Sequence, residues 1–276
     1  MIPLLAIFGL VLLVIGQPRG SQVSIEPASS PASWSHAAPR QDDPELIRRL
    51  ESIDRHAAEV ADLTADFEQR RHTPLLKKPL VSSGRVRVMG AIIRWDTLAP
   101  TASVLMMDAA SLRIFYPDQG ALEIYPIASG LARLAATPLP RLEIIREQFS
   151  IEECKASDFD RVPDEPTSPT VAIRLLPKTG ELSKTIREVR VLLDEVPGVE
   201  AAPGATSADK RPYGVARQVE VTDADGDRTV MVFERTRLNS GLKGADLELT
   251  VPPGTKVSRP LEMKSSDVRS DGIDRK

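Results

Sequence analysis

The residue types that most often carry catalysis or hold metals are few in this sequence, and their spacing matches no common site. His36, His56 and His72 show no metal-ligand spacing, and the single cysteine, Cys154, excludes both an internal disulfide and a zinc site built from several thiolates. The sequence contains neither a G-x-S-x-G nucleophile turn nor a glycine-rich phosphate loop. We therefore expect a protein that is not an enzyme and that uses no metal or other cofactor, with Cys154 as a small buried side chain.

Residues 223–227, with the sequence DADGD, are the nearest approach to a metal-binding loop. Their glycine follows the second aspartate rather than the third, and no glutamate closes the loop as calcium sites require. The segment is instead typical of a tight turn between two strands, so it predicts a hairpin turn there.

Arg94 is the charged residue whose position most needs an explanation. It follows the apolar run 91–93 and precedes Trp95, in a segment whose composition favours a half-buried strand. Strand alternation places Ile92 and Arg94 on one face and Ile93 and Trp95 on the other. From the residues alone a solvent-facing arginine is the expected case, because charged side chains are mostly exposed. The alternative is an arginine that faces inward and is used.

An amphipathic helix precedes the strands. Asp43 is a suitable N-cap and Pro44 a suitable first helical residue. Apolar residues then recur at three- and four-residue spacing, which predicts a helix over 44–60. A second helix is predicted over 141–149, where Leu142, Ile145 and Phe149 share one face.

The remaining segments have the alternation and turn signals of short strands joined by connections too short for parallel crossovers. Alternation begins at Leu63 and predicts strands at 84–88, 92–96, 103–107, 112–116, 121–127, 150–156, 170–176, 186–193, 216–222, 229–235 and 246–251. The sequence therefore predicts an α+β fold, in which a single curled antiparallel β-sheet forms an unclosed half-barrel with an α-helical lid on its concave side.

Composition limits the class of protein and its compartment. The chain has 276 residues, 41% of them hydrophobic, and a formal net charge of −3, which is too acidic to favour nucleic-acid binding. Residues 2–16 are apolar and uncharged but shorter than the ~20 residues that span a bilayer. They have the length of a signal-peptide core, although an uncleaved anchor is the competing interpretation, and both place the rest of the chain outside the cytoplasm.

The predicted organisation has four parts. Residues 1–20 form a signal peptide or N-terminal anchor, 21–42 a tether rich in Pro, Ser and Ala, 43–258 the folded half-barrel domain, and 259–276 a polar tail. Residues 197–212, rich in Pro, Gly and Ala, predict a long loop between two strands.

Several short motifs, in order along residues 43–258, resemble the LolA family of periplasmic outer-membrane lipoprotein carriers. They are DFEQRR at 66–71, Gly84, RWD at 94–96 with Pro100, LRIFYPDQGALEIYP at 112–126, RLLPK at 174–178, and FERTRLNSGLKGADLELTVPPGTKV at 233–257. Asp96 replaces the glutamate that is commoner in the family, and the 21–42 and 197–212 segments look like additions.

The resemblance implies a function and a role for Arg94. The half-barrel would shelter lipoprotein acyl chains, or another lipid, in an apolar cavity and carry them through the periplasm as a monomer, from an inner-membrane donor to an outer-membrane acceptor. Arg94 would point into the cavity as a latch that donates hydrogen bonds to backbone carbonyls of the lid, within 129–145. With the resemblance counted, the latch is favoured over a solvent-facing arginine.

The expected cavity wall is aliphatic and aromatic, although each of these residues could equally belong to ordinary core. The candidates are Phe67, Val86, Val88, Ile92, Trp95, Met106, Leu112, Ile114, Leu142 and Ile145. A second function stays open beside the carrier, namely a membrane-tethered domain of the same fold that senses lipid or lipoprotein.

Overall fold

The computed structural model describes residues 43–57, 60–108, 110–126, 142–160, 170–196 and 213–260. The predicted segments 1–20, 21–42 and 197–212, and residues 261–276 of the predicted tail, lie outside these ranges. Within the described ranges, no helix has both the length and the apolar character needed to cross a membrane.

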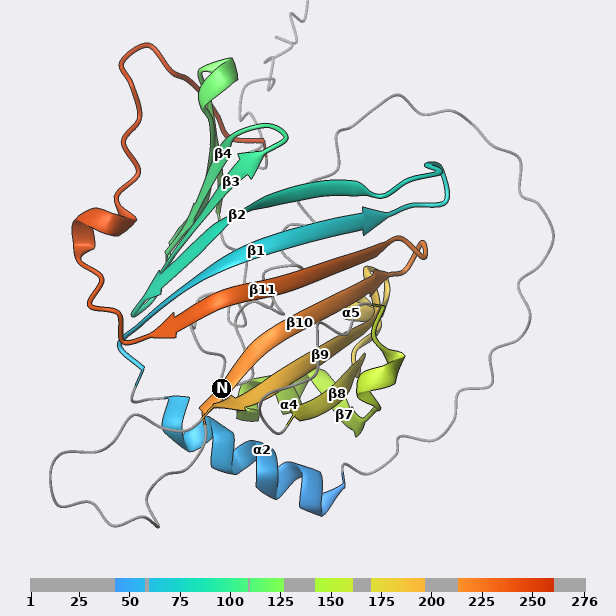
Figure 1. Ribbon diagram of the computed structural model, residues 1–276. Helices are drawn as coiled ribbons and strands as arrows, with labels where there is room; N and C mark the ends of the chain where they lie inside the picture. The colour runs from blue at the N-terminus through green and yellow to red at the C-terminus, as the bar shows by residue number, and fades with distance from the viewer. Residues whose placement is uncertain are drawn as a thin grey trace, which may run out of the picture.

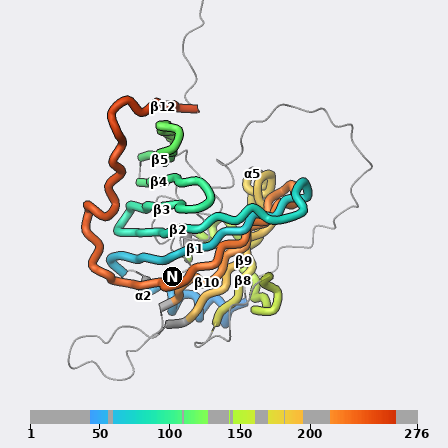
Figure 2. The backbone as a smooth tube through the Cα atoms, turned by 45° about the horizontal axis from the view of Figure 1, so that its top comes forward, coloured from blue at the N-terminus to red at the C-terminus, as the bar shows by residue number. Residues whose placement is uncertain are grey.

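Twelve strands form one sheet, which curls without closing on itself (Figures 1 and 2). The spatial order is β12-β6-β5-β4-β3-β2-β1-β11-β10-β9-β8-β7. All neighbouring strands are antiparallel except β12 and β6, which are parallel. The strands are β1 (Asp62–His72), β2 (Leu80–Met89), β3 (Ile92–Ala99), β4 (Ser103–Met107), β5 (Ser111–Tyr116), β6 (Ala121–Pro126), β7 (Phe149–Glu153), β8 (Thr170–Pro177), β9 (Ile186–Val196), β10 (Tyr213–Asp223), β11 (Arg228–Leu238) and β12 (Lys256–Ser258).

Helices α2 (Pro44–Ala57) and α4 (Leu142–Gln148) lie on the same face of this sheet, called the inner face below (Figure 1). Asp43 caps α2 as predicted, since its carboxylate accepts a hydrogen bond from the Glu45 amide at 2.9 Å. The short helices are α5 (Gly180–Ser183) and the 3-10 turns η1 (Pro117–Gln119), η2 (Ala156–Asp158) and η4 (Gly244–Leu247). The predicted α+β class, with one unclosed and mostly antiparallel sheet and two helices on its concave side, is thus confirmed.

The strand predicted at 246–251 is wrong. Residues 244–247 form η4 instead, and the last strand, β12, lies at 256–258. Asp246 explains the difference, because its carboxylate accepts a hydrogen bond from the Lys243 amide at 2.8 Å and so closes a local turn. Pro252 and Pro253 lack the amide hydrogens that a continuing strand would need.

Gly84 lies in the middle of β2, where the pairing with β3 shifts register. A Cβ atom at this position would lie 1.9 Å from the Asp96 carbonyl oxygen and 2.9 Å from the Phe67 ring. The close approach of β3 to β2 therefore depends on the absence of a side chain at this position.

Replacing Gly84 with alanine is expected to lower the free energy of unfolding by about 1–3 kcal/mol, because backbone and ring must both move to admit the methyl group. Urea denaturation of the purified protein would measure the loss. Gly180→Ala is the matched control, since a Cβ there meets nothing within 4 Å. An equal loss in both variants would contradict this explanation of Gly84.

Candidate functional site

The inner face of the sheet carries one continuous cluster of buried apolar side chains. Strands β1 to β5 and β7 to β11 all contribute to it, together with α2 and α4. Eight of the ten predicted cavity residues belong to this cluster, namely Phe67, Val86, Val88, Trp95, Leu112, Ile114, Leu142 and Ile145. Their use as a lipid site stays a prediction, because the same burial is expected of ordinary core.

The other two predicted residues, Ile92 and Met106, lie on the opposite, outer face. Met106 pairs with Arg94 across β3 and β4, and alternation places Ile92 on the same face as Arg94. Met106 is buried there and Ile92 is partly buried. These two residues therefore do not share a surface with the inner-face cluster.

Three aromatic rings lie at the centre of the cluster. Trp95 is 1% exposed, and its ring centroid lies 4.2 Å from that of Phe67 and 6.1 Å from that of Phe233. The two contacts are tilted and edge-on, the arrangements that aromatic quadrupoles favour. Trp95 thus joins β3 to β1 and β11 across the curl of the sheet.

The two helices cover one side of this cluster as a pair. Leu46, Leu50 and Ile53 of α2 pack into it, and α2 contacts both β10 and α4. The Asp54 carboxylate accepts a hydrogen bond from the Leu142 amide at 3.1 Å, which ties the end of α2 to the start of α4. Helix α4 contacts β7, so the described helices lie over the β7–β10 side of the sheet.

Arg94 lies on the outer face, not in the cavity that the resemblance implied. Its Nε and Nη2 donate hydrogen bonds to the Asp96 carboxylate at 2.9–3.1 Å, and its Nη1 donates to the Glu248 carbonyl oxygen. It does bind a backbone carbonyl, but one in the C-terminal segment rather than in the predicted lid. Most of the predicted lid partners, 129–141, lie outside the described residues.

The C-terminal segment 239–258 runs from the end of β11 past β2 and β3 to the edge strand β6 (Figures 1 and 2). Asp62 anchors its start, because the Asp62 carboxylate accepts hydrogen bonds from the Ser240 amide and hydroxyl and from the amides of Gly241 and Leu242, at 2.6–3.2 Å. Burial acts to raise the pKa of Asp62, but these hydrogen bonds outweigh it and hold the pKa below its ordinary value. The anchor therefore adds stability above the ordinary aspartate pKa, and this contribution is lost as the pH falls through the lowered value.

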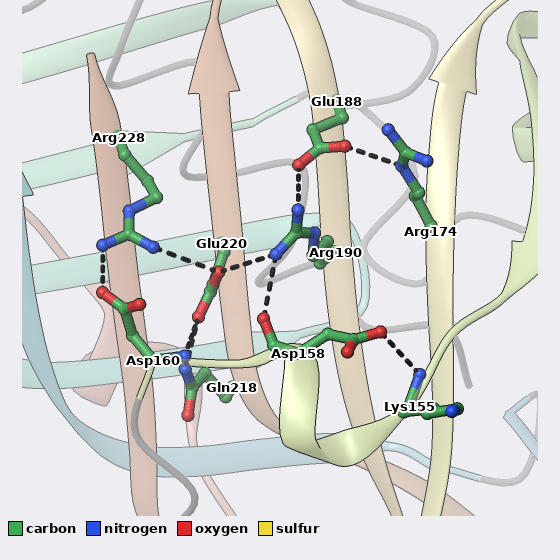
Figure 3. A network of polar contacts seen from close by, with 9 residues as sticks. All are labelled: Lys155, Asp158, Asp160, Arg174, Glu188, Arg190, Gln218, Glu220 and Arg228. Atoms are coloured by element: carbon green, nitrogen blue, oxygen red, sulfur yellow. Dashed lines mark hydrogen bonds and ion pairs between the residues drawn. The ribbon is translucent and has the colours of Figure 1, made fainter. Parts of the chain in front are cut away.

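A second feature of the outer face is a polar network over β8 to β11 (Figure 3). Glu188 accepts from Arg174 at 2.6 Å and pairs with Arg190 at 2.7 Å. Glu220, which is 2% exposed, accepts hydrogen bonds from the Gln218 side chain and the Asp160 amide, both at 2.8 Å.

Arginines connect the two buried carboxylates of this network to the segment that covers them. Arg190 donates to the Asp158 carbonyl at 2.9 Å and lies 3.9 Å from the Glu220 carboxylate. Arg228 pairs with Asp160 and lies 4.0 Å from Glu220 (Figure 3). Ion pairs link the carboxylates and guanidinium groups of the network, although the buried Glu220 Oε2 and Gln218 Oε1 accept no hydrogen bond in the described part of the chain. These contacts act to hold η2 and its flanking residues onto the sheet.

Cys154 lies beside this network and has the properties of a structural thiol. It packs with Phe159, Ala172 and Leu192 in a small apolar cluster. Burial, followed by the negative charge of Asp158, raises the pKa of the Cys154 thiol to about 11. The thiol is therefore protonated at neutral pH and is a poor nucleophile.

The DADGD segment forms the predicted hairpin turn between β10 and β11. The Asp227 amide donates to the Asp223 carboxylate at 2.8 Å, and Gly226 has a φ of 92°, which suits glycine. In the part of the chain that the structure describes, no group of three or more His, Cys, Asp or Glu side chains is placed to hold a metal ion.

Comparison with known proteins gives matches to solved structures alone. No family model and no curated protein matches the chain. One similar structure is an uncharacterized conserved protein from Thermus thermophilus, with 13% identity over 78% of this chain and 97% of that chain and a TM-score of 0.41. Another is an outer membrane lipoprotein-sorting protein domain from Vibrio parahaemolyticus, with 16% identity over 74% of this chain and 97% of that chain and a TM-score of 0.38. A LolA superfamily protein from Nitrosomonas europaea is similar at 10% identity over 74% of this chain and 97% of that chain, with a TM-score of 0.37.

At these identities the likeness concerns the course of the chain and does not extend to a ligand. The protein from Nitrosomonas europaea is described as a member of the LolA superfamily, the family whose motifs this sequence resembles.

Proposed function

We propose that this protein is a periplasmic carrier that binds the acyl chains of lipoproteins, or of a related lipid, and moves them toward the outer membrane. The observation that carries the proposal is the chemistry of the inner face. The inner-face side chains of β1 to β5 are apolar and buried in one continuous cluster, while the described helices contact β10 and β7. A concave apolar surface beneath separate helices is a usual form of lipid site.

The pairing of the two helices supports a lid that moves as one unit. Asp54 ties α2 to α4, and the contacts of both helices with the sheet are largely apolar. Polar bonds also join the helices to the sheet side, from Arg49 Nη2 to the Thr170 carbonyl at 3.2 Å and from Lys178, which follows β8, to the Arg146 and Gln148 carbonyls at 2.7 and 2.8 Å. Acyl chains that compete for the same apolar surface would displace both helices together.

The compartment and partners belong to the same proposal. Residues 1–20 act as a signal peptide or anchor, an inner-membrane donor loads the monomeric carrier, and an outer-membrane acceptor unloads it. The aliphatic inner face and the sequence resemblance support this route. Mass spectrometry of the mature N-terminus would distinguish a freely diffusing carrier, whose first residue follows the cleaved segment, from a tethered lipid sensor that retains it.

Displacement of a fluorescent fatty acid tests the proposed lipid site. Saturated fatty acids should compete saturably, and each added methylene should strengthen binding by about 0.8 kcal/mol, roughly fourfold in Kd, until the apolar surface is filled. Short carboxylic acids such as acetate serve as the control, because they carry the same headgroup without the chain. Competition that is independent of chain length would count against an acyl site.

We also propose that Arg94 fastens the C-terminal segment, in place of the lid that the resemblance implied. Because Arg94 holds the Glu248 carbonyl, it keeps the chain close to β12, whose Lys256 amide donates to the Gly120 carbonyl at 2.8 Å. Loss of a charge-assisted hydrogen bond of about 1.5–3 kcal/mol should loosen β12 from the edge of the sheet.

Arg94→Leu is therefore expected to speed hydrogen exchange of the Lys256 amide by about tenfold or more. Arg94→Lys should be intermediate, since lysine keeps the charge but loses the planar fork that holds Asp96 and Glu248 together. Exchange would be followed by NMR or mass spectrometry on the same preparation used for fatty-acid displacement. If the Lys256 amide exchanged at the same rate in Arg94→Leu, Arg94 would not hold the C-terminal segment against the sheet.

A further inference from the structure

Strands β2, β1 and β11 run side by side in the sheet (Figure 1). A polar groove lies on their outer face. Its volume is about 390 Å³, and four of its eight lining residues are arginines. The lining includes Thr64, Asp66 and the arginines Arg85, Arg87, Arg235 and Arg237. Within a chain whose formal net charge is −3, this is a local concentration of positive charge.

The register of the sheet assembles the four arginines from segments far apart in the sequence. Thr64 of β1 lies opposite Arg87 of β2 on one side and Arg237 of β11 on the other. Asp66, two residues further along β1, lies opposite Arg85. Side chains at these positions point to the same face, because paired residues on neighbouring strands share a face.

The carboxylates near the groove do not balance these arginines. Asp66 accepts from Arg85 at 3.1 Å and from Arg235 at 2.6 Å, while Arg87 pairs with Asp96 at 2.6 Å. Burial acts to raise the pKa of Asp66, but the two arginines outweigh it and the pKa is lowered, so Asp66 stays ionised.

Two guanidinium groups therefore share the single carboxylate of the lining. Glu234 adds only an exposed contact of 3.7 Å with Arg235. The Arg237 side chain makes no hydrogen bond or ion pair with any residue in the described ranges. The groove thus contains guanidinium N–H groups that are available to donate hydrogen bonds to an anionic ligand.

The backbone at Arg235 is a second, independent sign that this site is used. Asp66 pairs with Glu234 and Thr64 with Arg237, so two residues of β11 stand opposite the single Ala65 of β1. Arg235 occupies this bulge with a φ of 51°, a left-handed conformation that glycine adopts at lower cost. An arginine at a position suited to glycine is explained if its side chain binds a ligand in the groove.

We propose that this groove binds a phosphate group. Phosphate carries enough charge to satisfy several guanidinium groups, and its oxygens accept the paired hydrogen bonds that arginine forks donate. The groove volume falls within the ~300–1,000 Å³ of small-molecule sites, which leaves room for a group attached to the phosphate. The ligand is a phosphate ester, either a soluble one or the headgroup of an anionic phospholipid.

The site is separate from the proposed acyl-binding surface. The groove lies on the outer face, whereas the apolar cluster lies on the inner face of the same strands. Failure of the phosphate site would therefore leave the carrier proposal standing, and failure of fatty-acid binding would leave the groove untouched.

Calorimetric titration of the full chain with inorganic phosphate and with glycerol phosphate tests the proposal. Both should bind saturably at one site, and acetate at equal ionic strength should not compete. Arg237→Gln and Arg235→Gly should each weaken binding at least tenfold. Arg187→Gln is the matched control, because Arg187 lies on β9 and binds the Ala224 carbonyl outside the groove.

Arg235→Gly separates loss of the site from loss of the fold. Glycine relieves the left-handed backbone, so the variant should keep or raise its Tm while it loses phosphate binding. Absence of saturable binding, or binding that survives both groove substitutions, would overturn the proposal.

Vesicles distinguish the two sources of phosphate. Binding to phosphatidylglycerol vesicles that glycerol phosphate displaces and Arg237→Gln abolishes would identify a lipid headgroup. Saturable binding of glycerol phosphate without such vesicle binding would identify a soluble ester. Vesicle binding alone, insensitive to glycerol phosphate and to Arg237→Gln, would reflect general charge attraction and would contradict a phosphate site.

Discussion

Replacing Trp95 with alanine is expected to lower the free energy of unfolding by about 3–5 kcal/mol, the largest loss that we expect from removing a single apolar side chain. Trp95 is 1% exposed and contacts the rings of Phe67 and Phe233, so the substitution removes buried area and leaves a cavity where three strands meet. Chemical denaturation would measure the loss.

Two further substitutions sharpen this prediction. Trp95→Phe should cost much less than the alanine variant, because an aromatic ring still fills most of the space. Leu98→Ala, on the same strand but 68% exposed, should be nearly neutral. A loss below about 1 kcal/mol in Trp95→Ala would mean that Trp95 borders an open cavity rather than packed core, which would favour the lipid-wall interpretation.

The sequence was sufficient to predict most elements of the fold, because alternation and helical spacing are local properties. The start of α2 at Pro44 after the Asp43 cap, and the hairpin turn at 223–227, both follow from side-chain chemistry within a few residues. The strand β12 could not be predicted in this way. It has three exposed residues and exists because β6 offers a free edge.

The sequence predicted which side chains of a strand share a face, but not which of the two faces is buried. Alternation correctly separates Arg94 from Ile93 and Trp95, but alternation does not say which face becomes the core. The structure buries Ile93 and Trp95 in the inner-face cluster, so Arg94 and Ile92 face outward. The resemblance placed Arg94 in the cavity, and that placement is wrong because Ile93 and Trp95 occupy the core-facing side of β3.

The arginine groove illustrates a site that depends on register. Arg85 with Arg87, and Arg235 with Arg237, each occupy alternate positions of a strand, a pattern that indicates a basic stripe on one face. The sequence does not reveal that β1 lies between these two stripes, because β2 and β11 are separated by most of the chain. Only the pairing of Thr64 and Asp66 with both strands brings the stripes together.

Replacing Glu220 with alanine is expected to cost about 3–5 kcal/mol of unfolding free energy, because a buried charge partner is removed while its arginines stay. Glu220 is 2% exposed and accepts from the Asp160 amide and the Gln218 side chain. Its loss leaves both donors without this acceptor. It also removes the carboxylate that lies within ion-pair distance of Arg190 and Arg228.

The network would be expected to release the segment that it holds before the sheet itself unfolds. Amide exchange of residues 155–160 should therefore rise in Glu220→Ala more than exchange in β9 or β10. Glu220→Gln should fall between the wild type and the alanine variant, since its amide oxygen can still accept both hydrogen bonds but carries no charge. Glu234→Ala is the control, because that carboxylate is 59% exposed and its contact with Arg235 should contribute little. If Glu220→Ala and Glu234→Ala destabilised the protein equally, the network would contribute nothing to stability. In that case Phe159 and its apolar neighbours alone would hold η2 to the sheet.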